Sequence, residues 1–213
     1  MTTRYPLRTK RKAATKKKIV QAAQGIFYRK GYDATTLEEI ADAAGVHVQT
    51  LYRHFPNKQT LASHGDYRWF ERFREEITDP ERTSNTFEFW RGWLTQTFER
   101  LTNDGGEPYR QYITVRHANP SILGEMSRIG ARYEDLLCFS LAEDFGMAPG
   151  GPGKPRLVAG MLLAGSNYIF RRFEVEDIDL VQEAVAVVDE VEAMFGHLVK
   201  DRRPLTAQAR SAE

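Results

Sequence analysis

The chain has 213 residues, of which 41% are apolar and 11% aromatic, and a formal net charge of +1. A chain of this length and apolar content can bury a substantial core, which excludes disorder as its global state. Its sequence holds no secretory signal and no apolar run of roughly 18 residues, so we expect no membrane span and a cytoplasmic location.

The small net charge hides an asymmetry along the chain. Residues 1–58 hold 12 Lys or Arg and 4 Asp or Glu, a net charge of +8, whereas residues 59–213 hold 18 and 25, a net charge of −7. A basic head on an acidic body is expected where one end meets a polyanion. The alternative is that the basic runs are ordinary solvated surface.

The first half of this basic head predicts an arm and one helix. Residues 1–12 are basic and lack apolar periodicity, which predicts a flexible arm. Residues 13–30 then place apolar side chains on one helical face, and Gly31 follows where a helix C-cap belongs.

Two further helices follow at short spacing. Thr36 and Glu39 have the spacing of a capping box, which predicts a second helix that runs through Ala44. Gly45 permits a tight turn, and residues 47–54 predict a short third helix that ends before a proline. Together the three helices predict a helix-turn-helix DNA-binding domain at residues 13–60.

The third helix is the one expected to enter the major groove of DNA. Leu51 and Phe55 are four residues apart and are expected to face inward, which anchors the helix. The remaining side chains are then directed at base edges, as the major groove requires for sequence reading. The base-facing candidates are His47, Val48, Gln49, Thr50 and Arg53.

A second set of residues suits the phosphate backbone. Hydroxyls, cations and the free amides at a helix start are the groups that contact phosphates in protein–DNA complexes. The phosphate candidates are Thr36, the amide of Leu37, Tyr52, His54 and Lys58. The alternative is that Tyr52 lies in the core, that His54 is a surface histidine and that Thr36 is only a helix cap.

The sequence GYDATTLEEIA at residues 31–41, with GVHVQTLYRHFPNK at residues 45–58, resembles the amino-terminal signature of the tetracycline-repressor (TetR) family. The resemblance covers about residues 15–62. It implies that Thr36, Tyr52, His54 and Lys58 contact phosphates of a double-stranded DNA operator while the third helix faces bases. Members of the family are usually homodimeric repressors that a small ligand releases from a palindromic operator.

The rest of the chain predicts a larger helical domain at residues 61–202, which the family resemblance makes a ligand-binding and dimerisation domain. One long helix is expected to start at Lys58 and to run to Ile77, and helices follow over 83–102, 108–118, 120–145, 155–175 and 178–200. No segment alternates as a strand would, so the fold class is all-α. Residues 203–213 are polar and are expected to be disordered.

The last two helices are expected to form the homodimer interface. Apolar residues recur at spacings of three and four on the last helix, and small residues on the preceding helix permit close packing. The interface candidates are Val158, Met161, Gly165, Val181, Val188, Val191 and Phe195. The alternative is that both helices line the core of one chain.

Aromatic and polar residues at helical spacing suggest a ligand pocket in this domain. The candidates are Trp90, Trp93, Tyr112, Arg116, Tyr133, Asn167 and Tyr168, and the alternative is that the aromatic residues are plain core. The segment from Val115 to Pro120 resembles the ligand domain of regulators that sense acyl-CoA-like compounds. The ligand itself is unidentified.

No enzyme is predicted. Cys138 lies among apolar neighbours and reads as a buried small residue, and the sequence holds no glycine-rich phosphate loop, metal-ligand spacing or nucleophile with a base. We expect no cofactor and no metal. The remaining alternatives are a transcriptional activator or a regulator controlled by a protein partner.

Overall fold

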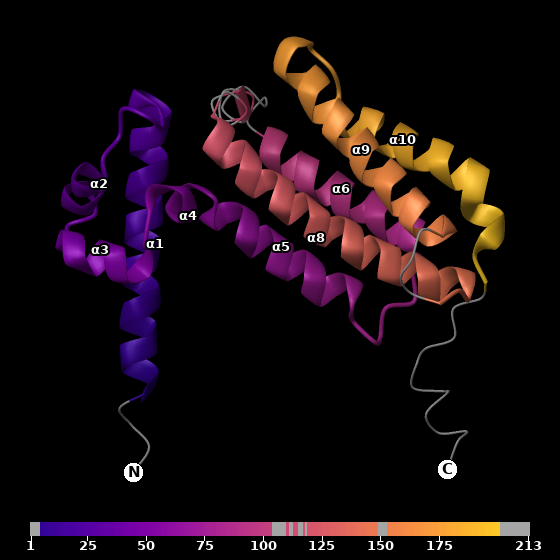
Figure 1. Cartoon of the computed structure of the whole chain (residues 1–213), viewed down its shortest axis with the longest axis horizontal. Coiled ribbons are helices and arrows are strands. Elements are labelled where there is room, and N and C mark those ends of the chain that lie inside the picture. Colours follow the sequence, from indigo (N-terminus) through magenta and orange to yellow (C-terminus); the bar gives the residue numbers. More distant parts are fainter. Residues whose placement is uncertain are drawn as a thin grey trace. The chain divides into compact units, whose positions relative to one another are not determined.

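The computed structural model describes residues 5–103, 110, 113, 114, 117, 119–148 and 153–200 (Figure 1). Every regular element in this part of the chain is a helix, which confirms the all-α prediction. The helices are α1 (Tyr5–Lys30), α2 (Leu37–Ala43), α3 (Val48–His54), α4 (Lys58–Ala62), α5 (His64–Ile77), α6 (Thr86–Thr102), α8 (Pro120–Phe145), α9 (Lys154–Val175), α10 (Leu180–Phe195) and a short 3-10 helix (Gly196–Leu198). The predicted tail at residues 203–213 lies outside the described residues.

The chain divides into two compact units. The first unit comprises Met1–Tyr67 and Val115–Met126, and the second comprises Arg68–Thr114 and Ser127–Glu213. The first unit extends beyond the predicted boundary at residue 60 and includes a second segment from Val115 to Met126. The Asn119 amide explains part of this, because its Nδ2 donates to Asp33 Oδ1 at 2.9 Å and so fixes the start of α8 to the first unit.

The predicted flexible arm is mostly helical, since α1 begins at Tyr5 rather than at residue 13. The residues involved include Lys, Arg and Ala, which favour helix. Residues 10–14 are exposed, so this part of α1 has no apolar face for a periodicity to reveal. The absence of an apolar stripe therefore indicated a solvated helix, not a flexible segment.

The first unit has its own small core, which α1, α2, α3 and α4 share. Its buried members are Ile19, Ala23, Leu37, Ile40, Ala41, Leu51, Phe55 and Leu61. Gly31 (φ +83°) and Gly45 (φ +64°) hold the left-handed conformations that end α1 and turn the chain between α2 and α3. Both predicted glycine roles are confirmed.

The long helix expected from Lys58 to Ile77 is instead two helices that meet at Ser63. The interruption is narrow, because the Ser63 amide still donates to the Gln59 carbonyl at 2.9 Å and the Tyr67 amide to the Ser63 carbonyl at 3.2 Å. Ser63 is fully buried and Gly65 follows it closely, and neither residue type favours a helix interior. The apolar periodicity runs across the interruption and therefore concealed it.

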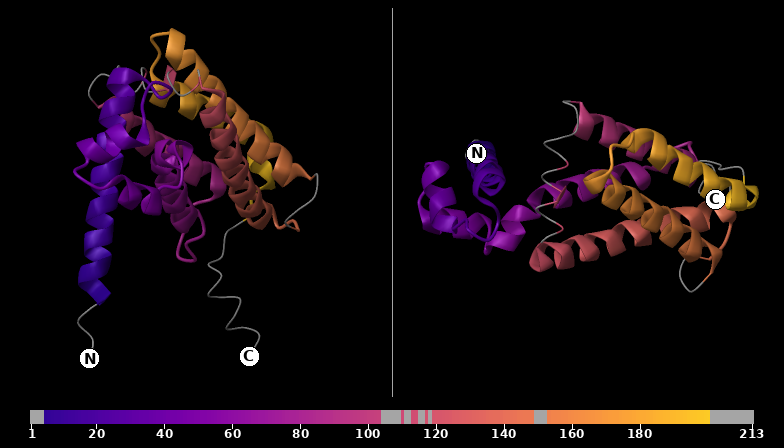
Figure 2. Two further views of the ribbon diagram at one scale, coloured as in Figure 1. Left: turned by 60° about the vertical axis from the view of Figure 1, so that its left-hand side comes forward. Right: turned by 90° about the horizontal axis from the view of Figure 1, so that it is seen from above.

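The second unit is a helical bundle in which α10 packs against both α6 and α9 (Figures 1 and 2). Its core is aromatic, with Phe73, Phe87, Trp90 and Phe98 all buried. Cys138 is 2% exposed, which confirms the prediction of a buried small residue. None of the described helices is both long and apolar enough to span a bilayer.

A buried polar contact ties the start of α6 to α8. Asp144, which is 1% exposed, accepts from the Thr86 amide at 2.6 Å, and the hydroxyls of Thr86 and Ser140 lie 2.6 Å apart. Ser140 also accepts from Arg82 Nη2 at 2.7 Å. Such hydrogen bonds satisfy groups that would otherwise destabilise the apolar interior.

Candidate nucleic-acid interface

Helix α3 has one buried face and one exposed face, as the sequence predicted. Leu51 and Phe55 are 0% and 1% exposed and fix the helix against the core of the first unit. His47, Gln49 and Arg53 are exposed. A two-turn helix held by its inner face, with polar side chains outside, has the form that a major groove accepts.

The outward face is not uniform. His47 is the N-cap of α3, and its Nδ1 accepts from the Gln49 amide at 3.3 Å, so this side chain also stabilises the helix start. Val48 and Thr50 are only half-exposed, and Val48 packs against the core of the first unit. Gln49 and Arg53 are therefore the base-facing candidates with the greatest freedom.

Tyr52 and His54 flank this face. Tyr52 is 45% exposed, so the alternative that it belongs to the core is wrong. Partial burial of His54 lowers the pKa of its imidazole, and the nearby cations Lys12, Arg53 and Lys16 lower this pKa further. These cations come from α1 and α3, so the two helices together create a positive region beside His54.

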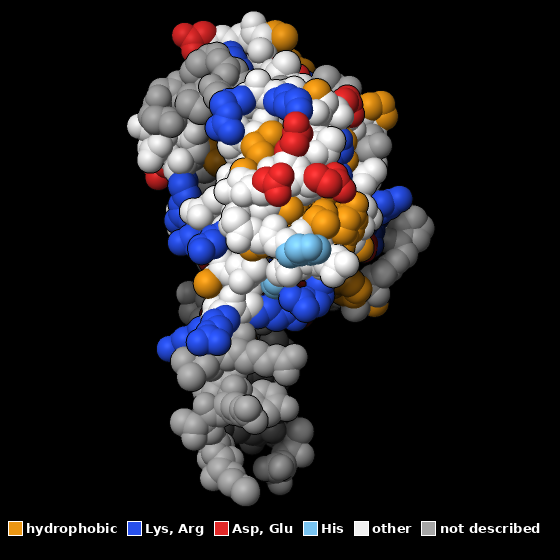
Figure 3. Space-filling model, turned by 90° about the vertical axis from the view of Figure 1, so that its left-hand side faces the viewer, with side chains coloured by type: hydrophobic (Ala, Val, Ile, Leu, Met, Phe, Trp, Pro, Cys, Tyr) orange, Lys and Arg blue, Asp and Glu red, His pale blue; other side chains and the backbone are white. Residues whose placement is uncertain are grey.

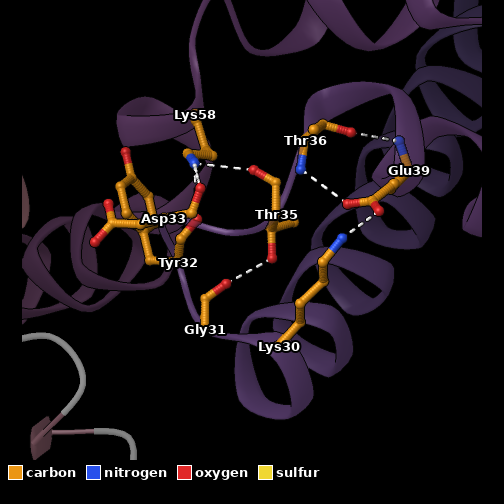
Figure 4. A network of polar contacts seen from close by, with 8 residues as sticks. All are labelled: Lys30, Gly31, Tyr32, Asp33, Thr35, Thr36, Glu39 and Lys58. Carbon is orange, nitrogen blue, oxygen red and sulfur yellow. Dashed lines mark hydrogen bonds and ion pairs between the residues drawn. The ribbon is translucent and has the colours of Figure 1, made fainter.

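The start of α2 carries the predicted capping box (Figure 4). The Thr36 hydroxyl accepts from the Glu39 amide at 3.2 Å, and the Glu39 carboxylate accepts from the Thr36 amide at 3.0 Å. The carboxylate also pairs with Lys30, and this hydrogen bond is the main reason why the pKa of Glu39 is lowered. Thr36 is therefore a helix cap, and its exposure leaves its phosphate role a prediction.

Leu37 and Lys58 differ more from the phosphate prediction. The Leu37 side chain is buried at 8% exposed, so only its amide remains a candidate. The Lys58 ammonium donates to the carbonyls of Tyr32 at 2.7 Å, Asp33 at 3.3 Å and Thr35 at 2.9 Å. These contacts use all three N–H groups of the ammonium, and the phosphate role of Lys58 stays a prediction.

The surface of one side of the molecule agrees with the charge asymmetry. Figure 3 shows Lys and Arg side chains below the histidine, along the edges and near the top of this face, with a group of acidic side chains in between. Lys10, Arg11, Lys12 and Arg53 are all exposed, and no ion pair involving them is found in the part of the chain that the structure describes. Exposed cations of this kind neutralise phosphates and make affinity dependent on salt.

The predicted pocket residues separate into three groups. Trp90, Trp93 and Tyr133 lie in one aromatic cluster of the second unit, where the rings of Phe73 and Tyr133 are 4.6 Å apart. Tyr112 and Arg116 lie outside the described residues. Asn167 and Tyr168 are exposed on α9 and do not join the cluster, because they occupy the opposite face of that helix from buried Ile169 and Phe173.

Two features of the aromatic cluster were not predicted. The guanidinium of Arg72 lies 5.5 Å from the Trp93 ring centre, and that of Arg100 lies 5.2 Å from the Trp69 ring centre. The Trp90 indole Nε1 is buried and has no hydrogen-bond partner among the described residues. The sequence showed cations and aromatics at helical spacing, but which indole lacks a partner depends on the packing.

The predicted dimer-interface residues mainly serve the core of a single chain. Val158, Val188 and Val191 are at most 4% exposed, and Met161, Val181 and Phe195 pack against the same core. A Cβ on Gly165 would collide with Val187 of α10. The apolar residues do recur along one face of each helix, but α6, α9 and α10 of a single chain already bury them. These residues therefore fit the alternative that both helices line the core of one chain.

Comparisons with known proteins agree with this geometry. The family described as "Bacterial regulatory proteins, tetR family" matches residues 19–64, which span α2, α3 and α4. The HTH-type transcriptional regulator TcmR of Streptomyces glaucescens is 25% identical over 206 residues, which are 93% of this chain and 91% of TcmR.

Two solved structures share the fold. SmeT, the repressor of the Stenotrophomonas maltophilia multidrug efflux pump SmeDEF, superposes with a TM-score of 0.65 and 24% identity over 89% of this chain and 94% of SmeT. FadR from Bacillus subtilis in complex with stearoyl-CoA has a TM-score of 0.59 and 21% identity over 82% of this chain and 96% of FadR. Residues 19–64 therefore match the TetR family, and over nearly its whole length the chain is similar to a transcriptional regulator of the helix-turn-helix type.

Proposed function

We propose that this protein is a homodimeric repressor that binds a palindromic operator and leaves it when a small ligand occupies the second unit. The observation that carries the proposal is α3, which exposes Gln49 and Arg53 while Leu51 and Phe55 hold it in place. Glutamine suits the adenine edge and arginine suits guanine. Its place of action is then the cytoplasm, where the operator lies.

Two copies of α3 explain how a two-turn helix achieves specificity. One such helix reads only a few base pairs, so a dimer that reads two half-sites about one DNA turn apart is the usual arrangement. The outward face of α9 supports a dimer, because Leu157 and Tyr168 are 57% and 52% exposed. Exposed apolar side chains on one helix face are typical of an interface.

The aromatic cluster supports a ligand in the second unit. The Trp90 indole N–H is buried without a partner in the part of the chain that the structure describes, which costs about 1–3 kcal/mol, and a ligand with a hydrogen-bond acceptor would remove this cost. The rings around Trp90 favour an apolar or aromatic ligand, and Arg72 and Arg100 favour one that carries negative charge. SmeT has been solved with triclosan and FadR with stearoyl-CoA, and both compounds have apolar bodies.

A route from ligand to DNA is available within the first unit. Residues 115–126 belong to this unit, and Asn119 holds Asp33 in the turn before α2. The chain enters this segment directly from the second unit, so a change in the second unit would reach the start of α2. The ligand would thus alter the separation of the two α3 helices in the dimer.

The decisive experiment is a salt-titrated binding assay with the full chain, its own upstream intergenic duplex and an unrelated duplex. We expect tight binding to the upstream duplex alone, weakened about tenfold or more by Gln49→Ala or Tyr52→Phe. Equal and weak binding to both duplexes would remove the sequence-specific part of the proposal.

The ligand is sought by a thermal-shift screen of acyl-CoAs and flat phenols. Compounds that shift the melting temperature are then tested for release of the protein from the operator duplex. A ligand that raises the melting temperature should lose most of this effect in Trp90→Phe, while the matched variant Trp69→Phe retains it. If no compound class moves the melting temperature or operator affinity, control by a protein partner becomes the better explanation. A reporter assay with and without the gene separates repression from activation.

A further inference from the structure

The turn between α1 and α2 encloses the ammonium of Lys58, the first residue of α4 (Figure 4). Three backbone carbonyls of the turn accept from Nζ, at 2.7 Å (Tyr32), 3.3 Å (Asp33) and 2.9 Å (Thr35). The ammonium also lies 4.3 Å from the centre of the Tyr32 ring. The turn therefore surrounds this cation much as a peptide loop surrounds a bound metal ion.

Local hydrogen bonds also hold the turn, and Asn119 Nδ2 donates to the carboxylate of its Asp33 at 2.9 Å. The Thr35 hydroxyl donates to the Gly31 carbonyl at 2.6 Å, and the Thr35 amide donates to the Tyr32 carbonyl at 3.3 Å. Gly31 already occupies the left-handed region. The contacts from Lys58 are thus the ones that join this turn to a helix 23 to 26 residues later in the chain.

The base of the Lys58 side chain is also fixed. Asn57 caps α4, since its Oδ1 accepts from the Thr60 amide at 2.8 Å, and Leu61 of the same helix is 3% exposed in the core of the first unit. Lys58 is therefore a firm connection between two elements. A flexible surface lysine would not keep hydrogen bonds to three carbonyls and a contact with an aromatic ring.

We propose that Lys58 is a positioning residue for DNA binding, which acts through the turn before α2 and not as a phosphate contact. An ammonium has three donors and no acceptor, and all three donors are engaged within the protein. By fixing Thr35, Lys58 sets where Thr36 caps α2, and α2 in turn packs against α3. The proposal rests on the DNA-binding function proposed above.

Salt dependence separates the two roles. Loss of a lysine that contacts a phosphate lowers affinity and reduces the slope of log affinity against log salt by about one. Loss of a positioning lysine lowers affinity and leaves the slope nearly unchanged. We therefore propose to measure binding of full-length wild type, Lys58→Met and Lys58→Arg to the upstream duplex at four salt concentrations.

Lys12→Met is the matched control, because Lys12 is an exposed cation of α1 close to His54. It removes the same charge without touching the turn, so its slope should fall by about one. Lys58→Met should bind about tenfold or more weakly with an unchanged slope. Lys58→Arg should also bind weakly, because a planar guanidinium cannot direct its donors at three carbonyls grouped around one point.

Amide hydrogen exchange without DNA provides the second measurement. Lys58→Met and Lys58→Arg should exchange faster at residues 35–41, whereas Lys12→Met should match the wild type. If the methionine variant fails to fold, as judged by its thermal melt, the arginine variant decides the question alone.

The opposite outcome would overturn the proposal. In that outcome Lys58→Arg binds with wild-type affinity, and Lys58→Met reduces the slope of log affinity against log salt by one. Amide exchange at residues 35–41 is then unchanged in both variants. If the wild type itself does not prefer the upstream duplex, the proposed operator function fails, while exchange at residues 35–41 still tests the role of Lys58.

Discussion

His54 lies half-buried at the end of α3, close to Lys12, Lys16 and Arg53. Burial and these three cations all disfavour the imidazolium, so the pKa of His54 lies below its usual value of 6.5. The neutral form is preferred in the folded state, and any stability it contributes is present above the unfolded pKa and is lost as pH falls through the folded pKa. A DNA phosphate would reverse the local charge and raise the same pKa.

We therefore predict that Lys12→Met raises the pKa of His54 in a histidine NMR titration of the DNA-free protein. The control is Lys18→Met, which removes an exposed cation of α1 that does not act on His54. DNA affinity of the wild type should increase as pH falls through the pKa of the complex, and His54→Gln should abolish this dependence. An identical pKa in wild type and Lys12→Met would contradict the assignment.

At the scale of an element, α9 contains two glycines with different surroundings. Gly165 faces α10, where an added Cβ would collide with Val187, whereas a Cβ on Gly160 would meet nothing within 4 Å. Alanine in a helix is about 1 kcal/mol more favourable than glycine, but overpacking costs about 1–3 kcal/mol. The two positions should therefore respond to the same substitution with opposite signs.

We predict that Gly165→Ala lowers the free energy of unfolding by about 0.5–2 kcal/mol, while Gly160→Ala leaves it unchanged or raises it by up to about 1 kcal/mol. Urea denaturation at one fixed protein concentration measures both, since a dimer makes apparent stability depend on concentration. Greater destabilisation by Gly160→Ala than by Gly165→Ala would mean that the open face of α9 is tightly packed in solution.

The elements also show which features the sequence could predict. The capping box at Thr36 and the turn at Gly45 were predicted correctly because a few adjacent residues determine them. The interruption at Ser63 was missed because the apolar periodicity continues across it. The stripe on α10 was assigned to a dimer because periodicity identifies a buried face but not the chain that buries it.

The same limit applies to the candidate site. The exposed face of α3 followed from the spacing of Leu51 and Phe55, and Tyr52 proved exposed as the DNA-contact reading required. The contacts of Lys58 could not be predicted, because their acceptors are backbone carbonyls, which leave no mark in the pattern of side chains. The Trp90 indole, which has no hydrogen-bond partner among the described residues, likewise depends on tertiary packing alone.

The charge of the whole molecule is divided between its ends. The net charge of +8 on residues 1–58 is nearly balanced by −7 on the remainder, so the protein as a whole is close to neutral. A local positive field attracts DNA, while near-neutrality limits the general repulsion between two copies of the chain. We propose that the exposed residues of α9 and α10 bring two such copies together.

We predict that the protein is a dimer in sedimentation velocity and that Leu157→Glu makes it a monomer, because a buried unpaired carboxylate destabilises an apolar interface. Met194→Glu on α10, where the methionine is 49% exposed, should act in the same direction. Phe139→Glu is the control, since this 51% exposed side chain lies on α8. A dimer that survives Leu157→Glu and dissociates in Phe139→Glu would place the interface on α8.

The two faces of α3 have a consequence for how this regulator diverges. Stability of the first unit depends on the buried Leu51 and Phe55, whereas Gln49 and Arg53 are exposed. Exposed substitutions of this kind usually change folding free energy by less than about 0.5 kcal/mol. A duplicated gene could therefore acquire a new target sequence through two codons, without any compensating change elsewhere in the protein.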